Sequence, residues 1–568
     1  MASLLDLQAR GLSESIALGL LDADDVQELL DRRYPGHRFP PTFARLLHHK
    51  TDGSPLFLVD LLRWLGSRGA LADFEGAWQL TRGLPEVERD LPPSVRGMIQ
   101  RKIEQLEESD RRLLTVASVQ GFLFDSTVLA DVLGMEQADV EERLTTLDKV
   151  YAFVRPVEEH DLPDGTLSVR HRFVHVLYQN ALYQELQGTR RVQLATQVAS
   201  ALETRYGGRA TEVAADLAVL WETARTPAKS SGYFAVGAMR AGEKFAYTES
   251  AELASRGLAQ IALLPDGEAK TTLEIGLRVS LGFTNVVTRG FHAPETFEQM
   301  HRAHELSKAS GNTPQLIPVL WGMVVYHIAS GQFIRAYEYA EQMIDIADAA
   351  GDVMLQSTAS SALSGAAFFR GRLPLSRESQ ARAEALTTPA MRAGIQAIVG
   401  SDPLLLSRCQ AGRAHWMAGD IAGARAIFDR MLADVRVSKD PRERAHGALH
   451  VAEFELAADR PDEALRVAAE ALHVCEEYGV ASERLWTAAY LGRAKIAVGE
   501  LDAGIATLEA TVGALTMFRC LASVSEYQGF LAEGYLEAGR VSDARQAVDE
   551  GLGNASSTGE IVWIPELH

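Results

Sequence analysis

Gly499-Glu-Leu-Asp-Ala-Gly504 is one of six related hexapeptides that recur through the second half of this 568-residue chain. Their first positions are separated by 40, 48, 40, 40 and 40 residues. A fixed period of this length is typical of stacked helical hairpins, in which no single hairpin can bury its apolar face alone. The other five copies are Gly331-Gln-Phe-Ile-Arg-Ala336, Gly371-Arg-Leu-Pro-Leu-Ser376, Gly419-Asp-Ile-Ala-Gly-Ala424, Asp459-Arg-Pro-Asp-Glu-Ala464 and Gly539-Arg-Val-Ser-Asp-Ala544.

Each hexapeptide falls at the turn between two predicted helices. Glycine suits this place because the residue after a helix often adopts a left-handed conformation. From about residue 188 onward the sequence reads as helix throughout, so we predict a tetratricopeptide-like α-solenoid over residues 188–568 with a period of about 40 residues. We assign a structural hinge role to Gly331, Gly371, Gly419, Gly499 and Gly539.

The first 87 residues read as a small helical domain. Asp22 is a plausible N-cap, and Ser54 followed by Pro55 is typical of a helix start. A short strand is predicted at Ser15–Leu18, and a hairpin is predicted to turn at Glu75-Gly76.

Residues 88–187 read as a winged helix, because helices are followed by two strands with a polar Asp164-Gly165 turn between them. The predicted elements are helices at Ser94–Leu106, from an N-cap at Ser109, at Phe124–Leu133 and at Gln137–Lys149, and strands at Tyr151–Val157 and Thr166–Phe173. The fold class expected for the whole chain is therefore mainly α.

The net charge of −20 argues against a broad basic surface for nucleic acid. The predicted recognition helix is itself acidic, since Glu136, Asp139, Glu141, Glu142 and Asp148 oppose only two basic residues. We therefore expect this helix to pack against protein rather than read DNA. An autonomous DNA-binding regulator stays an alternative, with a salt-dependent gel shift as its signature.

Motifs for catalysis are missing from the sequence. No Gly-x-x-x-x-Gly-Lys-Ser/Thr loop occurs, and the nearest match, Gly237 to Lys244, lies in a predicted helix. No Gly-x-Ser-x-Gly nucleophile motif occurs either. We expect no catalytic residue, no metal site and no NTP hydrolysis by this chain alone. His301 and His304 lie three residues apart but lack a third ligand at zinc-like spacing.

A cytoplasmic location is expected from three further features. The cysteines Cys409, Cys475 and Cys520 show no metal or redox spacing and read as buried thiols. Asp6 and Arg10 interrupt the N-terminal apolar stretch, which predicts no signal peptide. The most apolar window, Leu316 to Tyr326, is too short to span a bilayer. We also expect a longer parent chain, because both ends look cut.

The sequence contains three longer motifs, Thr51-Asp-Gly-Ser-Pro-Leu-Phe-Leu-Val-Asp-Leu-Leu62, Leu91-Pro-Pro-Ser-Val-Arg96 and Arg172-Phe-Val-His-Val-Leu-Tyr-Gln-Asn-Ala-Leu-Tyr183. With these motifs, the order of helical lid, winged helix and tetratricopeptide-like array resembles the signal-transduction ATPases with numerous domains (the STAND class). More narrowly, the chain looks like the C-terminal part of bacterial regulators that join such an ATPase to an adenylate or guanylate cyclase, a Ser/Thr kinase or a LuxR-type output domain.

The resemblance implies roles for three residues. Gly53 and Pro55 match the lid segment that covers the adenine, and His175 matches a histidine that senses the phosphates. It also implies ATP or ADP with Mg as cofactor of the parent family. The phosphate loop and the magnesium-binding carboxylate are absent here, so these residues are nucleotide-contact candidates only if a nucleotide-binding domain is supplied from elsewhere.

Two hypotheses for function follow. In the first, the chain is a non-catalytic sensor or scaffold that binds a protein or small-molecule inducer through its repeats. In the second, it is a fragment of an ATP-binding switch that controls a cyclase, kinase or transcriptional output. Both agree with cytoplasmic signal transduction through protein–protein contacts.

Overall fold

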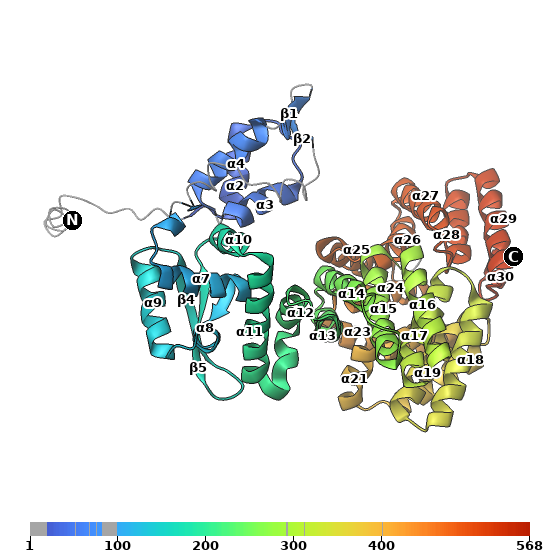
Figure 1. Cartoon of the computed structure of the whole chain (residues 1–568). Helices are drawn as coiled ribbons and strands as arrows, with labels where there is room; N and C mark the ends of the chain where they lie inside the picture. Colours follow the sequence, from blue (N-terminus) through green and yellow to red (C-terminus); the bar gives the residue numbers. More distant parts are fainter. Residues whose placement is uncertain are drawn as a thin grey trace, which may run out of the picture. The chain divides into compact units, whose positions relative to one another are not determined.

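The computed structural model describes residues 20–51, 53–67, 69–74, 77–81, 99–100, 102–290, 293–311, 313–399 and 402–568. The predicted strand at Ser15–Leu18, the turn at Glu75-Gly76 and the motif at Leu91–Arg96 lie outside these residues. Contacts divide the chain into unit 1 (residues 1–212 and 219–226) and unit 2 (residues 213–218 and 227–568). The described residues are predominantly helical, which confirms the predicted mainly α class (Figure 1).

The N-terminal part of unit 1 is a small helical segment. Asp22 caps its first helix, because the Asp22 carboxylate accepts from the amides of Asp24 and Asp25 and the Asp25 carboxylate accepts from the Asp22 amide. Leu30, Phe43 and Leu62 meet in its core. Its elements are α2 (Ala23–Arg33), α3 (Pro41–Thr51), α4 (Pro55–Ser67) and the antiparallel strands β1 (Leu71–Phe74) and β2 (Ala77–Leu80).

A three-stranded antiparallel sheet organises the next segment of unit 1, with strand order β3-β5-β4. We call residues 108–185 the sheet-containing segment. It consists of α7 (Glu108–Gln120), β3 (Leu123–Asp125), α8 (Ser126–Leu133), α9 (Gln137–Lys149), β4 (Val154–Asp161), β5 (Leu167–Phe173) and α10 (Val176–Glu185).

Three predicted boundaries in this segment are wrong. Ser109 does not cap a helix, because α7 already begins at Glu108 with Glu107 as its N-cap. Phe124 lies in β3 rather than in a helix, because its backbone pairs with His171 of β5 and its ring is buried against the sheet's aromatic residues. The strand predicted at Tyr151–Val157 begins only at Val154, since Ala152 has a φ of +49° that interrupts extended backbone.

Helix α11 (Gly188–Tyr206) packs with unit 1, although residue 188 is where the repeat array was predicted to begin. Arg205 near its end pairs with Asp131 at 2.7 Å and with Asp164 of the strand turn at 3.0 Å. The 3-10 helix η1 (Gly207–Val213) and α12 (Ala214–Thr223) follow. The three-part division of the chain into residues 1–87, 88–187 and 188–568 stays a prediction.

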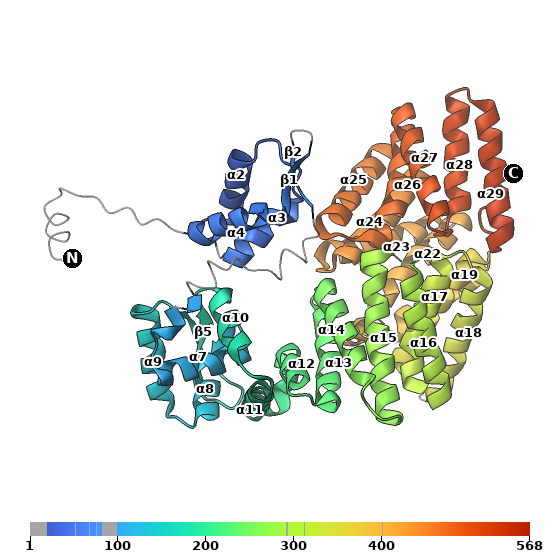
Figure 2. The same ribbon diagram turned by 45° about the horizontal axis from the view of Figure 1, so that its top comes forward.

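Unit 2 is a series of antiparallel helical hairpins, and neighbouring hairpins lie side by side in Figures 1 and 2. The paired helices are α13 (Pro227–Glu243) with α14 (Tyr247–Ile261), α15 (Glu268–Arg289) with α16 (Pro294–Ser310), α17 (Thr313–Ala329) with α18 (Phe333–Ala350), α19 (Val353–Phe369) with α20 (Leu373–Leu386), α22 (Pro403–Met417) with α23 (Ile421–Val437), α24 (Pro441–Ala457) with α25 (Pro461–Tyr478), α26 (Ala481–Ala497) with α27 (Leu501–Met517), and α28 (Val524–Glu537) with α29 (Val541–Thr558).

The hexapeptides mark the turns inside these hairpins. Their first residues all have positive φ, from +55° at Asp459 to +92° at Gly499. The one interval of 48 residues contains the additional helix α21 (Pro389–Val399). Arg392 on α21 pairs with Asp402 and, at 2.9 Å, with Asp434, so the inserted helix is held to the next hairpin by ion pairs.

Close backbone approach within hairpins depends on glycine. A Cβ added at Gly504 of α27 would lie 2.7 Å from the carbonyl oxygen of Gly492 on α26. A Cβ added at Gly412 of α22 would lie 2.8 Å from the ring of Phe428 on α23. Any side chain at these positions would push the paired helices apart.

The stack of hairpins in unit 2 curls so that late elements meet early ones. Helix α26 contacts α15. The amide of Ala522 donates to the carbonyl of Ala329 at 3.2 Å, and the amide of Ile561 donates to the carbonyl of Phe369 at 3.3 Å. Arg370 donates to the carbonyl of Gly559 at 2.9 Å. Unit 2 is therefore a compact superhelix that closes upon itself, not an open rod.

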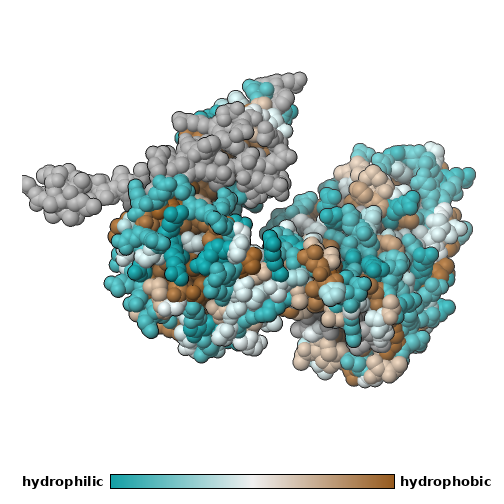
Figure 3. Space-filling view, viewed as in Figure 1, coloured by the Kyte–Doolittle hydropathy of each residue, from teal (hydrophilic) through white to brown (hydrophobic). Residues whose placement is uncertain are grey.

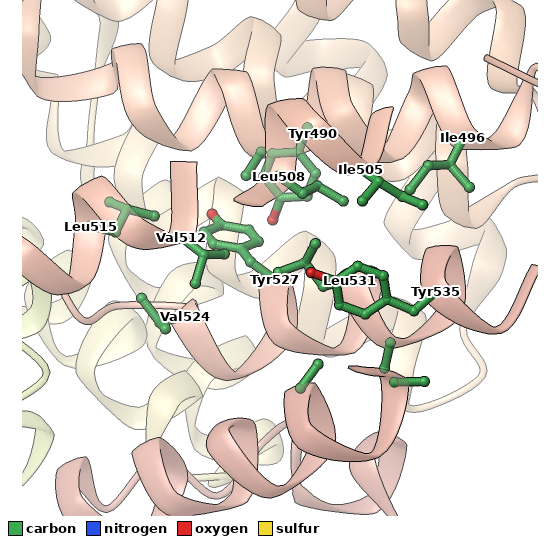
Figure 4. Close-up of a cluster of buried hydrophobic side chains, with 14 of the residues drawn as sticks. Tyr490, Ile496, Ile505, Leu508, Val512, Leu515, Val524, Tyr527, Leu531 and Tyr535 are labelled. Carbon is green, nitrogen blue, oxygen red and sulfur yellow. The ribbon is translucent and has the colours of Figure 1, made fainter. Parts of the chain in front are cut away.

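Apolar contacts between successive hairpins form the core. In the C-terminal hairpins, Tyr490, Leu508, Tyr527 and Leu531 pack together (Figure 4). The visible face of unit 2 carries hydrophilic residues over much of its area, with smaller hydrophobic groups between them (Figure 3). Within the described parts of the chain, no helix combines the length and the apolar character that crossing a bilayer requires.

We predict that Gly539→Ala destabilises unit 2 by about 1–2 kcal/mol, because alanine is strained at a φ of +73° even though no atom lies near the new Cβ. The matched change Gly513→Ala, in the middle of α27 with equally open space, should instead stabilise it by up to about 1 kcal/mol. Urea unfolding followed by circular dichroism measures both. Equal effects of the two changes would contradict a left-handed requirement at the hinge.

Candidate functional site

One position of the repeat faces the inside of the superhelix in four successive hairpins. It lies six residues before the hinge, on the first helix of each hairpin, and carries alternating charge. The cavity it lines has a volume of about 820 Å³. We call it the central cavity, and the four charged residues are Arg413, Glu453, Arg493 and Glu533.

Aromatic side chains form much of the remaining wall of the central cavity. Most of them come from the same first helices, within three residues of the charged positions. The segment that ends the described chain, with the short helix α30 (Ile564–Leu567), closes one side. The aromatic residues are Trp416 of α22, Phe428 of α23, Phe454 of α24, Tyr490 of α26, Phe530 of α28 and Trp563 just before α30.

Arg413 is the most buried charge of the column, with 3% of its side chain exposed. Its Nε lies 2.5 Å from Glu453 Oε1, and its Nη2 donates to Glu526 Oε2 at 2.8 Å. Its guanidinium also stacks on Phe368 and Trp563, with centroids at 4.7 and 4.8 Å. These contacts satisfy the planar cation from several sides at once.

Arg493 and Glu533 repeat the same pairing two hairpins further along the array, at 2.6 Å. Their side chains are more open, with 24% and 48% exposed. The cavity therefore has a fixed inner pair and an outer pair that water can reach.

Three carboxyl groups gather around the single cation Arg413. Burial opposes ionisation of Glu453, but Arg413 and His450 outweigh it and hold the Glu453 pKa below its usual range. Burial raises the pKa of Glu526 although Arg413 lies beside it, because Glu453 and Glu560 add negative charge. Burial likewise raises the pKa of Glu560 to about 7. One cation cannot neutralise three carboxylates, so this cluster retains protons at neutral pH.

Gly53 and Pro55, the nucleotide-contact candidates of the lid, have clear structural roles. Gly53 has a φ of +70°, and a Cβ there would lie 1.8 Å from the carbonyl oxygen of Leu21. Its own carbonyl accepts from the Leu21 amide at 2.9 Å. Pro55 is exposed and begins α4. Helix start and close packing account for both residues.

His175, the third candidate, is the N-cap of α10 in the sheet-containing segment. Its Nδ1 accepts from the amide of Leu177 at 3.1 Å, and 4% of the residue is exposed. The near-match to a phosphate loop lies where its sequence context predicts, since Gly237 is inside α13, and a Cβ added there would lie 3.4 Å from the amide nitrogen of Ala215.

The charged column was missed by motif searching, although its signal is present in the sequence. Arg413, Glu453, Arg493 and Glu533 are separated by 40 residues each, like the hinges that follow them. Aligning the repeats on their hinge residues and reading each position down the column would have identified it. Aromatic residues such as Trp416 and Tyr490 are spread through the repeats, and only the fold separates those that line the cavity from those in the core.

No family model matches this sequence, and no match is found among curated proteins. Among solved structures, a STAND protein with a tetratricopeptide repeat sensor from Pyrococcus horikoshii matches with 12% identity and a TM-score of 0.33, covering 96% of this chain and 68% of that one. A Rap protein complexed with competence and sporulation factor matches with 10% identity and a TM-score of 0.42, covering 59% and 99%. The quorum sensor NprR from B. thuringiensis, in its apo form, matches with 11% identity and a TM-score of 0.35, covering 56% and 97%.

We predict a distinctive pH dependence of stability from Glu560. Its folded-state pKa of about 7 exceeds the usual glutamate value, so the folded state holds a proton that the unfolded chain has lost. This contribution to stability is complete below about pH 4 and disappears as pH rises through 7. The free energy of unfolding of Glu560→Gln, relative to that of wild type, should therefore be higher at pH 8 than at pH 5 by on the order of 2 kcal/mol.

Urea unfolding at both pH values tests this expectation. Glu537→Gln, at an exposed position of α28, is the matched control and should change the pH dependence little. A Glu560→Gln variant that keeps the wild-type slope between pH 5 and 8 would show that Glu560 is ionised in the folded protein.

Proposed function

We propose that this chain is the non-catalytic sensor region of a signal-transduction ATPase, and that its repeats bind an inducer in the central cavity. The observation that carries the proposal is the cavity itself, with its aromatic walls and its column of alternating charge. Its volume of about 820 Å³ lies in the range of roughly 300–1,000 Å³ that ligand pockets occupy.

A short peptide, as part of a protein or by itself, is the inducer that this lining suits best. Aromatic faces accept apolar side chains, while Arg493 and Glu533 offer a cation and an anion that water already reaches. A peptide with side chains of both charges could satisfy both groups. A small amphipathic molecule would use the same walls and is the other outcome of the test below.

We further propose that residues 1–87 and the sheet-containing segment relay binding to a nucleotide-binding domain that this sequence lacks. The order of elements in the sheet-containing segment supports a winged helix. The exposed residues of α9 and its N-cap include the acidic Glu136, Asp139 and Glu142. Because these side chains are negatively charged, the helix suits contact with a protein surface better than with the phosphate backbone of nucleic acid. In this proposal the inducer shifts the population between two arrangements of the switch.

A cytoplasmic location is part of the proposal. Cys409, Cys475 and Cys520 are free and buried, which suits a reducing compartment.

We predict that Ala457→Trp blocks the central cavity. Ala457 is an exposed residue at the end of α24 that lines it, so an indole there fills space without removing a core contact. Affinity-selection mass spectrometry with a pool of random hexapeptides should recover peptides on the wild-type chain. Their recovery on Ala457→Trp should fall at least tenfold.

The matched control is Ala469→Trp, an exposed alanine of α25 that does not line the cavity. It should retain the same peptides as wild type. Failure of the wild-type chain to retain any hexapeptide, or equal losses in both variants, would refute peptide binding in the cavity. Retention of a metabolite pool in place of peptides would identify the inducer as a small molecule.

We predict no nucleotide binding by the chain alone. Gly53, Pro55 and His175 have no phosphate loop beside them in sequence, so calorimetry with ADP and Mg should give no heat above dilution. Heat that Pro55→Ala reduces would show instead that the lid binds nucleotide by itself, and would favour the switch-fragment hypothesis.

A further inference from the structure

A cysteine and two histidines meet inside unit 2, next to the central cavity. Cys409 lies on α22, and His446 and His450 lie one helical turn apart on α24. Each offers one ligand atom, and the three atoms lie within 4.8 Å of one another. The two imidazole rings are 5.1 Å apart.

His446 has no hydrogen bond at either ring nitrogen, although both nitrogens are buried. A carboxylate oxygen, Oε1 of Glu483, lies 3.6 Å from its Nδ1. Buried polar atoms nearly always find partners, so an imidazole left in this state needs an explanation. A ligand bound at the ring would supply one.

A carboxylate lies on the Nδ1 side of each histidine ring. Nδ1 of His450 lies 2.8 Å from Glu453 Oε2, which leaves Nε2 as the nitrogen available to a ligand. At His446, Glu483 Oε1 lies on the Nδ1 side of the ring at 3.6 Å, which is beyond hydrogen-bond distance. Metal-binding histidines commonly face a carboxylate in this way, because it fixes the ring and strengthens the nitrogen as a donor.

We propose that Cys409, His446 and His450 bind a zinc-class divalent cation that links α22 to α24. One thiolate and two imidazoles are ligands that Zn²⁺ prefers, and histidines at i and i+4 on one helix are a common arrangement for it. The fourth ligand is water. A cavity of about 60 Å³ touches both histidines, and that volume exceeds what one water molecule needs.

The geometry requires a small adjustment. Zn–S and Zn–N bonds of about 2.3 and 2.0–2.1 Å in a tetrahedron place ligand atoms roughly 3.3–3.6 Å apart. The present spacing of up to 4.8 Å therefore has to shorten by about 1.2–1.5 Å, and the His446 ring can move toward the other two ligands without breaking a hydrogen bond of its own. Coordination breaks the S–H bond of Cys409, forms the S–metal bond and releases one proton to the buffer.

The site goes beyond the proposed inducer cavity and does not depend on it. It shares a wall with that cavity, because Glu453 orients His450 on one side and pairs with Arg413 on the other. The sequence predicted no metal site, since Cys409 is 37 residues from His446 and no local spacing joins them. Only the stacking of two repeats brings them together.

Cobalt(II) is the probe for this site, because a bound thiolate gives it a charge-transfer absorption band and tetrahedral coordination gives intense visible bands. The full chain, stripped with a chelator and titrated with Co²⁺, should show both bands at one equivalent. Zn²⁺ should displace the cobalt and abolish them. Cys409→Ser should lose the thiolate band, whereas Cys475→Ser, at another buried cysteine, should keep it.

His446→Ala should weaken cobalt affinity at least 100-fold while the fold survives, since the ring makes no hydrogen bond. His473→Ala, at an exposed histidine of α25, is its matched control and should leave affinity unchanged. Saturating Zn²⁺ should also raise the melting temperature of wild type but not of His446→Ala. Absence of the thiolate band in wild type, or equal cobalt affinity in the His446 and His473 variants, would overturn the proposal.

Discussion

The buried guanidinium of Arg413 is the interaction on which the interior of the superhelix depends. It contacts Glu453 of the next hairpin, Glu526 two hairpins further on, Phe368 of an earlier one and Trp563 near the end of the described chain. A buried cation without partners costs several kcal/mol, and removing one partner of a buried pair is strongly destabilising. The hairpins that supply these partners are therefore coupled to one another through a single side chain, which favours the closed form over an open rod.

The repeat explains why the interior of unit 2 contains both side chains that stabilise the fold and side chains that a ligand could reach. Four successive hairpins contribute the same inward position, six residues before the hinge, so one helical geometry presents a regular column of side chains. Changing the residue at that position changes chemistry without changing the backbone. Arg413 and Glu453 became part of the core, whereas the equivalent Arg493 and Glu533 stay accessible. Burial, not residue type, separates the two roles.

Periodicity made the helical array predictable, because the hexapeptides report turn chemistry that is local in sequence. Elements whose boundaries depend on distant partners were not predictable to the same extent. Phe124 belongs to a strand only because β5 lies beside it, and its local sequence favours helix. The cluster of Cys409, His446 and His450 was not predictable for the same reason, because its members are distant in sequence. The closure that brings Ala522 to Ala329 also depends on distant residues. Gly53 shows the converse, since close packing against Leu21 accounts for a glycine that the motif alone assigns to nucleotide contact.

The two ion pairs of the column would respond differently to an inducer of the kind proposed. A ligand carboxylate that approaches Arg493 competes with Glu533, and the released Glu533 stays hydrated because nearly half of its side chain is exposed. The same approach to Arg413 would leave the ionised Glu453 buried without its cation. Exchange is therefore favoured at the outer pair and opposed at the inner one. An inducer would therefore bind at the accessible pair, Arg493 and Glu533, while the buried pair, Arg413 and Glu453, keeps the hairpins in register.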